Sequence, residues 1–176
     1  MCGLLAAGCS ASAPRVSPPA AAAEHSVADG HRSSESDPLD RVAAIHGGAG
    51  PWVVSGYRMG AFALGQLGLK QGSFDLEVIH HSPRQVQYSC VADGAAAATG
   101  ASLGKLNLSL EEAKEADLRT TYRRKSTGQT ITLRPSRAFV ERYKDVPRER
   151  LGDAGREVLG LPDDQVFEVV RGSAPP

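Results

Sequence analysis

The stretch that decides the fold is IHGGAGPWVVSGYRMGAFALGQLG, residues 45–68. It begins as a glycine-rich turn, passes Pro51, and continues with apolar residues spaced by three and four positions. These residues are Val53, Tyr57, Ala61, Leu64 and Leu67. Such spacing places an apolar stripe on one face of a helix, and proline is well tolerated in a helix's first turn. The stretch therefore predicts a glycine turn that leads into the central helix of the fold.

The glycine residues of this stretch predict two different kinds of close contact. Gly47, Gly48 and Gly50 follow His46, and without a Cβ they let the backbone approach a ligand at the start of the helix. Gly56 and Gly60 lie one helical turn apart, which favours close packing against another backbone. That backbone belongs either to a strand of the same chain or to a second subunit, so a homodimer is one expectation.

Composition limits the classes of function. The 176 residues suffice for one domain and a tail, and Lys plus Arg equals Asp plus Glu at 20 each. This balance gives no electrostatic reason to expect a nucleic-acid partner. No run approaches the roughly 18 apolar residues of a membrane-spanning helix. Three cysteines, at positions 2, 9 and 90, do not make a disulfide framework.

Residues 1–36 are rich in Ala, Ser and Pro and are predicted to be an unstructured tail. Within them LLAAGCSAS, residues 4–12, resembles a bacterial lipoprotein cleavage box in which Cys9 is lipidated. No Lys or Arg precedes the box, and its apolar run is short for a signal sequence. Two interpretations therefore stay open. Either the natural start lies upstream and the tail tethers a protein of the cell envelope or periplasm to the membrane, or the match is fortuitous and the protein is cytoplasmic.

The folded domain is expected over residues 38–170, with helices at both ends and strands between them. Alternation predicts a strand over residues 74–79 that stops at His80–Pro83, a second strand over 85–89, and another over 104–110. Asp93 is expected to cap a short helix over 93–99. The remaining expected elements are a helix over 39–45, a hairpin from 118–125 and 130–134, helices over 136–143 and 147–159, and a last strand over 165–170. This order predicts an α+β domain with a mainly antiparallel sheet and packed helices.

Four side chains outside the tail could ligate a metal: His46, His80, His81 and Cys90. Imidazole and thiolate are ligands for a zinc-like ion, and a nearby helix N-terminus lowers the pKa of a thiol. Other interpretations of the same residues stay open. Cys90 serves equally as a small core residue, and His80 and His81 point to opposite faces of a strand, so at most one of them joins a given site.

Three stretches carry a resemblance to a known family: HGGAGPWVVSGYRMG at 46–60, SCVADGAAAATGASLGKLNL at 89–108 and TTYRRKSTGQ at 120–129. Together they resemble the FmdE family, which takes its name from formylmethanofuran dehydrogenase. In that resemblance His46 matches the first histidine of the family's His-x-His-x-Cys-Pro-Gly turn, and Pro51 matches its proline. The remaining matches are Gly56-Tyr57-Arg58, Cys90, Asp93, Thr99-Gly100, Gly104-Lys105 and Asn107.

The resemblance implies an accessory protein with a transition metal, zinc-like, at the glycine turn. The sequence departs from the family at chemically important positions, because Gly48 replaces the second histidine, Gly50 the cysteine of the turn, and Ala101 another cysteine. Many members add a C-terminal zinc ribbon that is not expected here. The chain therefore resembles a divergent bacterial-type member.

Three hypotheses follow. In the first, the protein binds one zinc-like divalent ion or a small ligand in a pocket lined by His46, His80, His81 and Cys90. The supporting positions of that pocket are Gly47, Gly48, Gly50, Asp93, Lys105 and Asn107, for which structural roles are the alternative: a helix cap for Asp93 and a solvated strand position for Lys105. In the second, Cys90 serves an enzyme as its nucleophile. In the third, the protein is a degenerate, metal-free member with a structural or partner-binding role.

Overall fold

The computed structural model describes residues 37–170 as one α+β domain, which confirms the predicted fold class. The helices are α1 (Pro38–His46), α2 (Pro51–Leu67), α3 (Val86–Thr99), α4 (Arg137–Tyr143), α5 (Leu151–Gly160) and α6 (Asp163–Val166). The strands are β1 (Leu76–Ser82), β2 (Leu108–Glu112), β3 (Arg119–Arg124), β4 (Thr130–Pro135) and β5 (Phe167–Val169). The predicted tail and the last six residues lie outside the described part of the chain.

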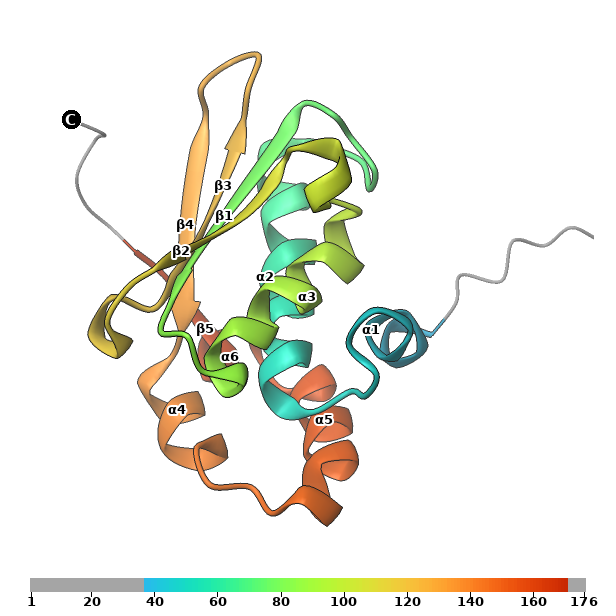
Figure 1. Cartoon of the computed structure of the whole chain (residues 1–176), viewed down its shortest axis with the longest axis vertical. Helices are drawn as coiled ribbons and strands as arrows, with labels where there is room; N and C mark the ends of the chain where they lie inside the picture. The colour runs from blue at the N-terminus through green and yellow to red at the C-terminus, as the bar shows by residue number, and fades with distance from the viewer. Residues whose placement is uncertain (1–36, 171–176) are drawn as a thin grey trace, which may run out of the picture. The chain divides into compact units, whose positions relative to one another are not determined.

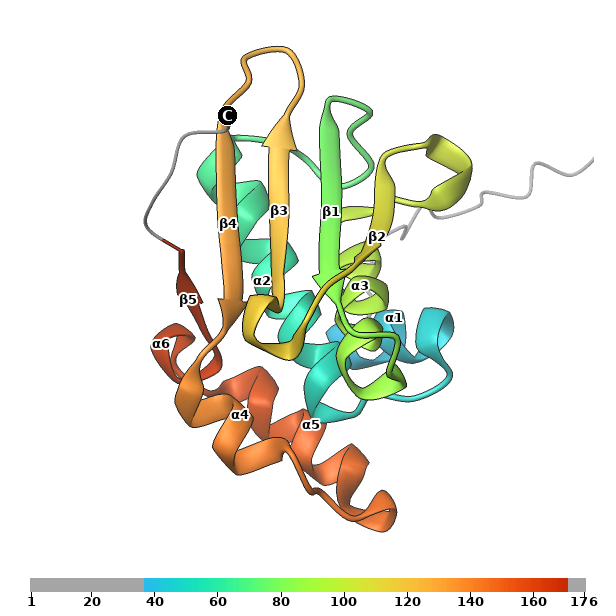
Figure 2. The ribbon, with the colours of Figure 1, turned by 60° about the vertical axis from the view of Figure 1, so that its left-hand side comes forward.

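The five strands form one sheet in the order β2-β1-β3-β4-β5 (Figure 2). Three of the four neighbouring pairs are antiparallel, and only β1 and β2 run parallel, with Val78 opposite Leu108. A parallel pair needs a long crossover connection, and α3 supplies it. The mainly antiparallel sheet thus contains one β-α-β unit, β1-α3-β2.

Helices α2 and α3 lie side by side against one face of the sheet (Figure 1). Between the two layers lies an apolar core in which Val54, Met59, Val78, Val91 and Tyr122 are fully buried. None of the described helices covers the other face of the sheet, as Figure 2 shows. Within residues 37–170, no helix has both the length and the apolarity to cross a bilayer.

The predicted close approach at Gly56 and Gly60 is confirmed, but the neighbour is helix α3 of the same chain and not a strand of the sheet or a second subunit. A Cβ at Gly56 would overlap the Val91 carbonyl, and one at Gly60 would lie 2.9 Å from the Ala98 Cβ. From the other side, a Cβ at Gly94 of α3 would overlap the Val53 carbonyl of α2. The two helices therefore pack backbone to backbone, which fixes the position of every side chain that α3 carries.

The segment between residues 80 and 99 differs from its prediction. Strand β1 continues through His80 and His81 to Ser82, and it ends only at Pro83, which cannot join a ladder. The strand predicted over 85–89 is the start of α3, a helix of 14 residues. The alternating run of residues 85–89 is too short to distinguish a strand from the start of a helix, and the alanine-rich residues that follow it favour a helix. Asp93 consequently lies in the middle of α3 rather than capping it.

The later elements follow the prediction more closely. The hairpin β3–β4 is confirmed, and so is α4, whose cap Ser136 accepts a hydrogen bond from the Phe139 N–H. The strand predicted over 104–110 is instead a single 3-10 turn, Leu103–Lys105, followed by β2. The helix predicted over 147–159 divides into a 3-10 turn, Arg148–Arg150, and α5. The last predicted strand is shortened by α6 to β5.

Candidate ligand pocket

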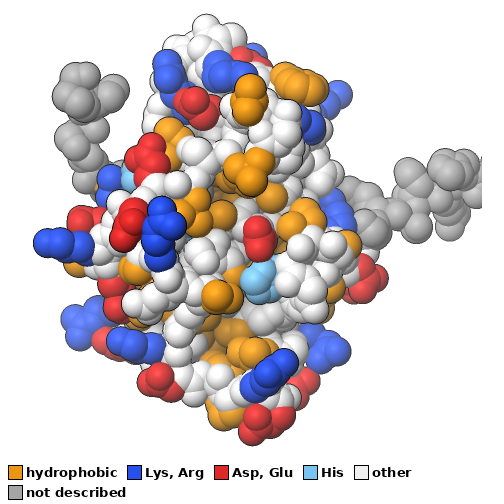
Figure 3. Space-filling view, in the orientation of Figure 1, with side chains coloured by type: hydrophobic (Ala, Val, Ile, Leu, Met, Phe, Trp, Pro, Cys, Tyr) orange, Lys and Arg blue, Asp and Glu red, His pale blue; other side chains and the backbone are white. Residues whose placement is uncertain are grey.

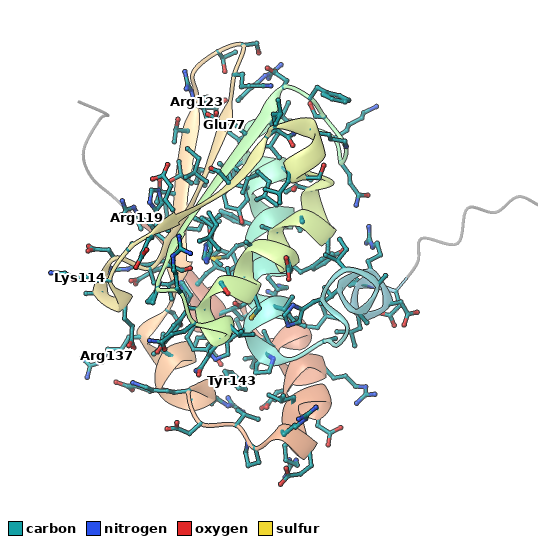
Figure 4. The ribbon with its side chains drawn as sticks, in the orientation of Figure 1. Glu77, Lys114, Arg119, Arg123, Arg137 and Tyr143 are labelled. Carbon is teal, nitrogen blue, oxygen red and sulfur yellow. The ribbon has the colours of Figure 1, made fainter. Side chains whose placement is uncertain are left out.

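A cavity of about 560 Å³ lies beside the glycine turn that joins α1 to α2. Its walls come from this turn, from the first turns of α2 and α3, and from the segment that joins α4 to α5. The lining residues used below are His46, Gly48, Gly50, Cys90, Tyr143 and Arg148. In Figure 4 the label of Tyr143 lies at the end of α4, on the side of α5. We call this cavity the turn pocket.

The histidine of the turn is held by a carboxylate of α3. His46 is the last residue of α1, and its Nδ1–H donates to Asp93 Oδ2 at 2.8 Å, because an ionised carboxylate only accepts. The His46 side chain is 26% exposed and that of Asp93 is 45% exposed. In Figure 3 a histidine lies beside an acidic side chain in the middle of this face. This hydrogen bond fixes the ring and its tautomer, and it leaves Nε2 without a protein partner among the described residues.

The chain turns sharply after His46 because Gly47 adopts a left-handed conformation, with φ of 84°, and closes α1 with a hydrogen bond to the Ala43 carbonyl. Helix α2 then starts at Pro51 with Gly50 as its N-cap residue, without a capping side chain and without an acidic residue in its first turn. The N–H groups of Trp52 and Val53 therefore have no protein acceptor within residues 37–170. These donors give the turn pocket a positive electrostatic character.

Cys90 lines the same pocket, one helical turn before Asp93. Its thiol is buried and donates a hydrogen bond to the Gln87 carbonyl at 3.2 Å. Burial, and next the nearby Asp93 carboxylate, raise the pKa of the Cys90 thiol to about 12. The prediction that a helix N-terminus lowers this pKa is wrong, since Cys90 lies inside α3 rather than just before it. At neutral pH the group is a thiol and not a thiolate, so the geometry does not favour Cys90 as a nucleophile.

The structure places the other two histidines away from the turn pocket. His80 is fully buried under α3, where its Nε2–H donates to the Tyr88 carbonyl at 3.0 Å. Burial lowers the pKa of His80 to about 4, so the ring is neutral, and Nδ1 accepts from the Thr120 hydroxyl at 2.9 Å. Both ring nitrogens of His80 are thus engaged within the core.

His81 points to the opposite face of the sheet, as the alternation along a strand requires. Its Nδ1 lies 3.3 Å from Glu111 Oε2 of the neighbouring strand β2. Burial is the main cause that lowers the pKa of His81, and nearby Arg119 adds to it. The two adjacent histidines therefore belong to two separate environments, and neither lines the turn pocket.

Lys105 and Asn107 also lie elsewhere, in the turn between α3 and β2. Lys105 Nζ donates to the Gly100 carbonyl at 2.8 Å, which closes the C-terminal end of α3. The buried Asn107 side chain accepts from the Ser102 N–H at 3.0 Å and donates to the Leu76 carbonyl at 3.1 Å. Both residues hold the backbone of this turn in place.

Of the four predicted metal ligands, the turn pocket contains His46 and Cys90. Among residues 37–170, no three His, Cys, Asp or Glu side chains form a group that could hold a metal ion. A structural zinc site uses four protein ligands, and even a catalytic one uses three. Two ligands, one of them a buried thiol that must first lose its proton, do not fit a resident ion.

Several residues of the pocket escaped prediction because they come from the far end of the sequence. Helix α5 packs so closely on the glycine turn that a Cβ at Gly155 would overlap the Ala49 carbonyl. This packing brings Leu151, Gly152 and Arg148 to the pocket. The spacing of Gly152 and Gly155 on α5 is the one local signal of such close packing, and it does not identify the partner.

A second cavity, of about 520 Å³, lies on the other side of Trp52. Its lining includes Trp52, Tyr88, Leu118 and the ion pair of Arg134 with Glu168. It contains none of the predicted site residues. The turn pocket is therefore the stronger candidate for a functional site.

The family model described as "FmdE, Molybdenum formylmethanofuran dehydrogenase operon" matches residues 45–168, from the glycine turn to β5. Among curated proteins, none matches the chain.

Proposed function

The chain belongs to the FmdE family, and from that premise we propose that it is an accessory protein that binds a small polar ligand in the turn pocket. The observation that carries the proposal is the hydrogen bond between His46 and Asp93 at the edge of a cavity of about 560 Å³. A carboxylate that orients a histidine leaves the other ring nitrogen available to a ligand.

The ligand that fits this pocket carries a hydrogen-bond acceptor or a negative charge. The residues that line the space include His46, Trp52 and Val53 at the start of α2, and Arg148, and each of them brings a hydrogen-bond donor. Arg148 forms no ion pair with a described acidic residue. Asp93 is the acidic group that contacts His46, and it is already hydrogen-bonded to the imidazole. A compact carboxylate or oxyanion would complement these donors.

A zinc-like ion is the second candidate, and one specific observation favours it. Histidines that bind metals usually donate their other N–H to a carboxylate, which is the arrangement of His46 and Asp93. Cys90 would add a second ligand only after losing its proton, so binding would be weak and would strengthen as the pH rises.

Isothermal titration calorimetry on the full chain separates these candidates, with inorganic phosphate, acetate and Zn²⁺ as the probes. Saturable binding of either anion that is lost in His46→Ala and weakened in Arg148→Ala supports the small-ligand function. Binding of Zn²⁺ that is lost in both His46→Ala and Cys90→Ser supports the metal function. Arg134→Ala, which changes the second cavity, is the matched control and should leave both unchanged. If neither the anions nor the metal binds, the proposed function is wrong and the degenerate-member hypothesis gains support.

Location is a separate proposal. The LLAAGC box around Cys9 supports attachment to the membrane of the cell envelope, in a part of the chain that the structure does not describe. Fractionation of cells that express the full chain tests it. Cys9→Ala should release the protein from the membrane fraction if lipid attachment holds it there.

A further inference from the structure

Three loops meet at the end of the domain opposite the turn pocket (Figures 1 and 2). They are the segment 68–75 after α2, the turn 100–107 after α3, and the hairpin turn 125–129 between β3 and β4. Hydrogen bonds join them, since the Gly72 N–H donates to the Thr99 carbonyl and the Lys125 N–H donates to the Asp75 carbonyl. We call this region the loop end.

The loop end presents large apolar side chains to solvent. Phe74 is 67% exposed, Leu103 is 72% exposed and Leu106 is 92% exposed. Leu106 is also the one non-glycine residue with a positive φ, 53°, within the described part of the chain. Glycine or asparagine usually occupies such a position, because a longer side chain strains the backbone there. A leucine that is both strained and exposed contributes nothing to the core, which points to an external contact.

The backbone that carries these apolar side chains is held in place by hydrogen bonds. The buried Asn107 ties the turn to strand β1 through the Leu76 carbonyl, and the Ser102 hydroxyl accepts from the Lys105 N–H at 3.3 Å. Lys105 Nζ in turn lies 5.3 Å from the centre of the Phe74 ring. The apolar side chains therefore project from a fixed backbone, and binding would order few further residues.

The charge around the apolar side chains is positive. Lys70, Lys105 and Lys125 form no ion pair with any described acidic residue. The two acidic residues beside them are already neutralised: Asp75 by Arg124 at 3.0 Å, and Glu77 by Arg123 at 3.5 Å. The Glu77 and Arg123 labels lie together in Figure 4. The three loops thus carry three lysines without an ion-pair partner among the described residues, and one of them, Lys105, lies beside Phe74.

We propose that the loop end docks on a membrane surface that contains anionic lipid, with Phe74, Leu103 and Leu106 in the interface and the lysines at the headgroups. Apolar side chains on a basic surface are the combination that such a surface attracts. A specific protein interface needs about 800 Å² on each partner, whereas this region is a set of projecting loop tips without either described cavity. The turn pocket, at the other end of the domain, stays open to its ligand in this orientation.

Co-sedimentation with lipid vesicles tests the proposal, on the full chain with Cys9→Ser so that no attached acyl chain contributes. The vesicles are phosphatidylcholine alone and a mixture of phosphatidylcholine with phosphatidylserine. Binding to the mixed vesicles should exceed binding to phosphatidylcholine, and added salt should weaken it. Leu106→Asn should reduce the binding constant by roughly tenfold, since one large apolar side chain leaves the interface.

The substitution Leu106→Asn suits this test because asparagine accepts a left-handed backbone, so the variant should be at least as stable as the parent. Ile45→Ser is the matched control: Ile45 is an exposed apolar residue, 51% exposed, at the end of α1. It should bind vesicles as the parent does.

Three results would overturn the proposal. The first is equal or absent binding to the two kinds of vesicle. The second is binding that Leu106→Asn and Phe74→Ser leave unchanged, which would assign the contact to another part of the chain. The third is absent vesicle binding together with self-association that Leu106→Asn abolishes, which would make a second copy of the chain the occupant of the loop end.

Discussion

Two histidines contact the same helix from different sides, and their surroundings differ completely. His80 lies beneath α3 in the core and uses both ring nitrogens, one for the Tyr88 carbonyl and one for the Thr120 hydroxyl. His46 lies at the surface beside α3 and uses one nitrogen, for the Asp93 carboxylate. The difference shows what burial does to a histidine. Each nitrogen of a buried ring needs a protein partner, so both are hydrogen-bonded within the fold. A partly exposed ring such as that of His46 can leave one nitrogen available to a ligand.

The largest expected effect on stability comes from substituting the buried histidine, His80. His80→Ala should lower the free energy of unfolding by roughly 3–5 kcal/mol, because it leaves a cavity and two buried polar groups without partners. Urea denaturation followed by circular dichroism measures this value. His46→Ala is the comparison and should lower it by less than about 1 kcal/mol. Similar losses in both variants would show that the two histidines do not differ as described.

The second expected effect is a dependence of stability on pH, caused by the lowered pKa of the buried His80. Its pKa is 6.5 when unfolded and about 4 when folded, so between these values the unfolded chain binds the proton that the folded chain excludes. Stability contributed by the neutral ring is complete above pH 6.5 and is lost as the pH falls towards 4, on the order of 3 kcal/mol in all. Urea denaturation at several pH values measures the slope. A variant His80→Gln should show a clearly smaller slope, and an unchanged slope would assign the effect to other groups.

A third experiment examines the backbone contact that positions α3. Gly60→Leu should lower the free energy of unfolding by about 1–3 kcal/mol through overpacking, since its Cβ would lie 2.9 Å from the Ala98 Cβ. Gly65→Leu, in the same helix, is the matched control, because nothing lies within 4 Å of its added Cβ. Thermal unfolding of both variants gives the comparison. Equal stability of the two would mean that α2 and α3 do not approach as closely as described.

The smallest expected effect on stability comes from substituting Asp93, the partner of the partly exposed His46. Asp93→Asn should change the free energy of unfolding by less than about 1 kcal/mol, because the pair with His46 is partly solvated. It should nevertheless change the tautomer balance of the His46 ring, since the carboxylate that accepts from Nδ1–H is gone. Nitrogen-15 NMR of the imidazole measures this balance. A ring signal that is the same in parent and variant would contradict the hydrogen bond.

The sequence predicted the central helix, the hairpin and the α+β class because these depend on local signals. The apolar stripe of α2, the glycine in the turn after Ser126 and the cap at Ser136 each act within a few residues. The strand predicted over 85–89 failed for the opposite reason: its alternating residues suit both a strand and the start of a helix, whereas the helix predicted over 93–99 is the second half of α3. Besides the alanine-rich continuation, the packing of Gly94 against Val53 of α2 stabilises the helix, and that contact spans some forty residues of sequence.

The candidate site was predictable in part. His46 and the glycine turn stand next to each other in the sequence, so their shared position could be foreseen. The pairing of His46 with Asp93 could not, because it required α3 to extend past Asp93 in both directions. The separation of His80 from His46 was equally hidden, since a histidine at a strand end and one buried beneath a helix have the same sequence signature.

The way in which α5 closes the turn pocket has a consequence for the synthesis of the chain. His46 leaves the ribosome early, whereas Arg148, Leu151 and Gly155, which complete the walls and press on the glycine turn, follow about a hundred residues later. A nascent chain that ends at the hairpin already has α2, α3 and four strands, but its pocket is open on one side. The candidate pocket is therefore completed only after α2, α3 and four strands have been made, and termination at the hairpin would yield a chain with most of the sheet and an incomplete pocket.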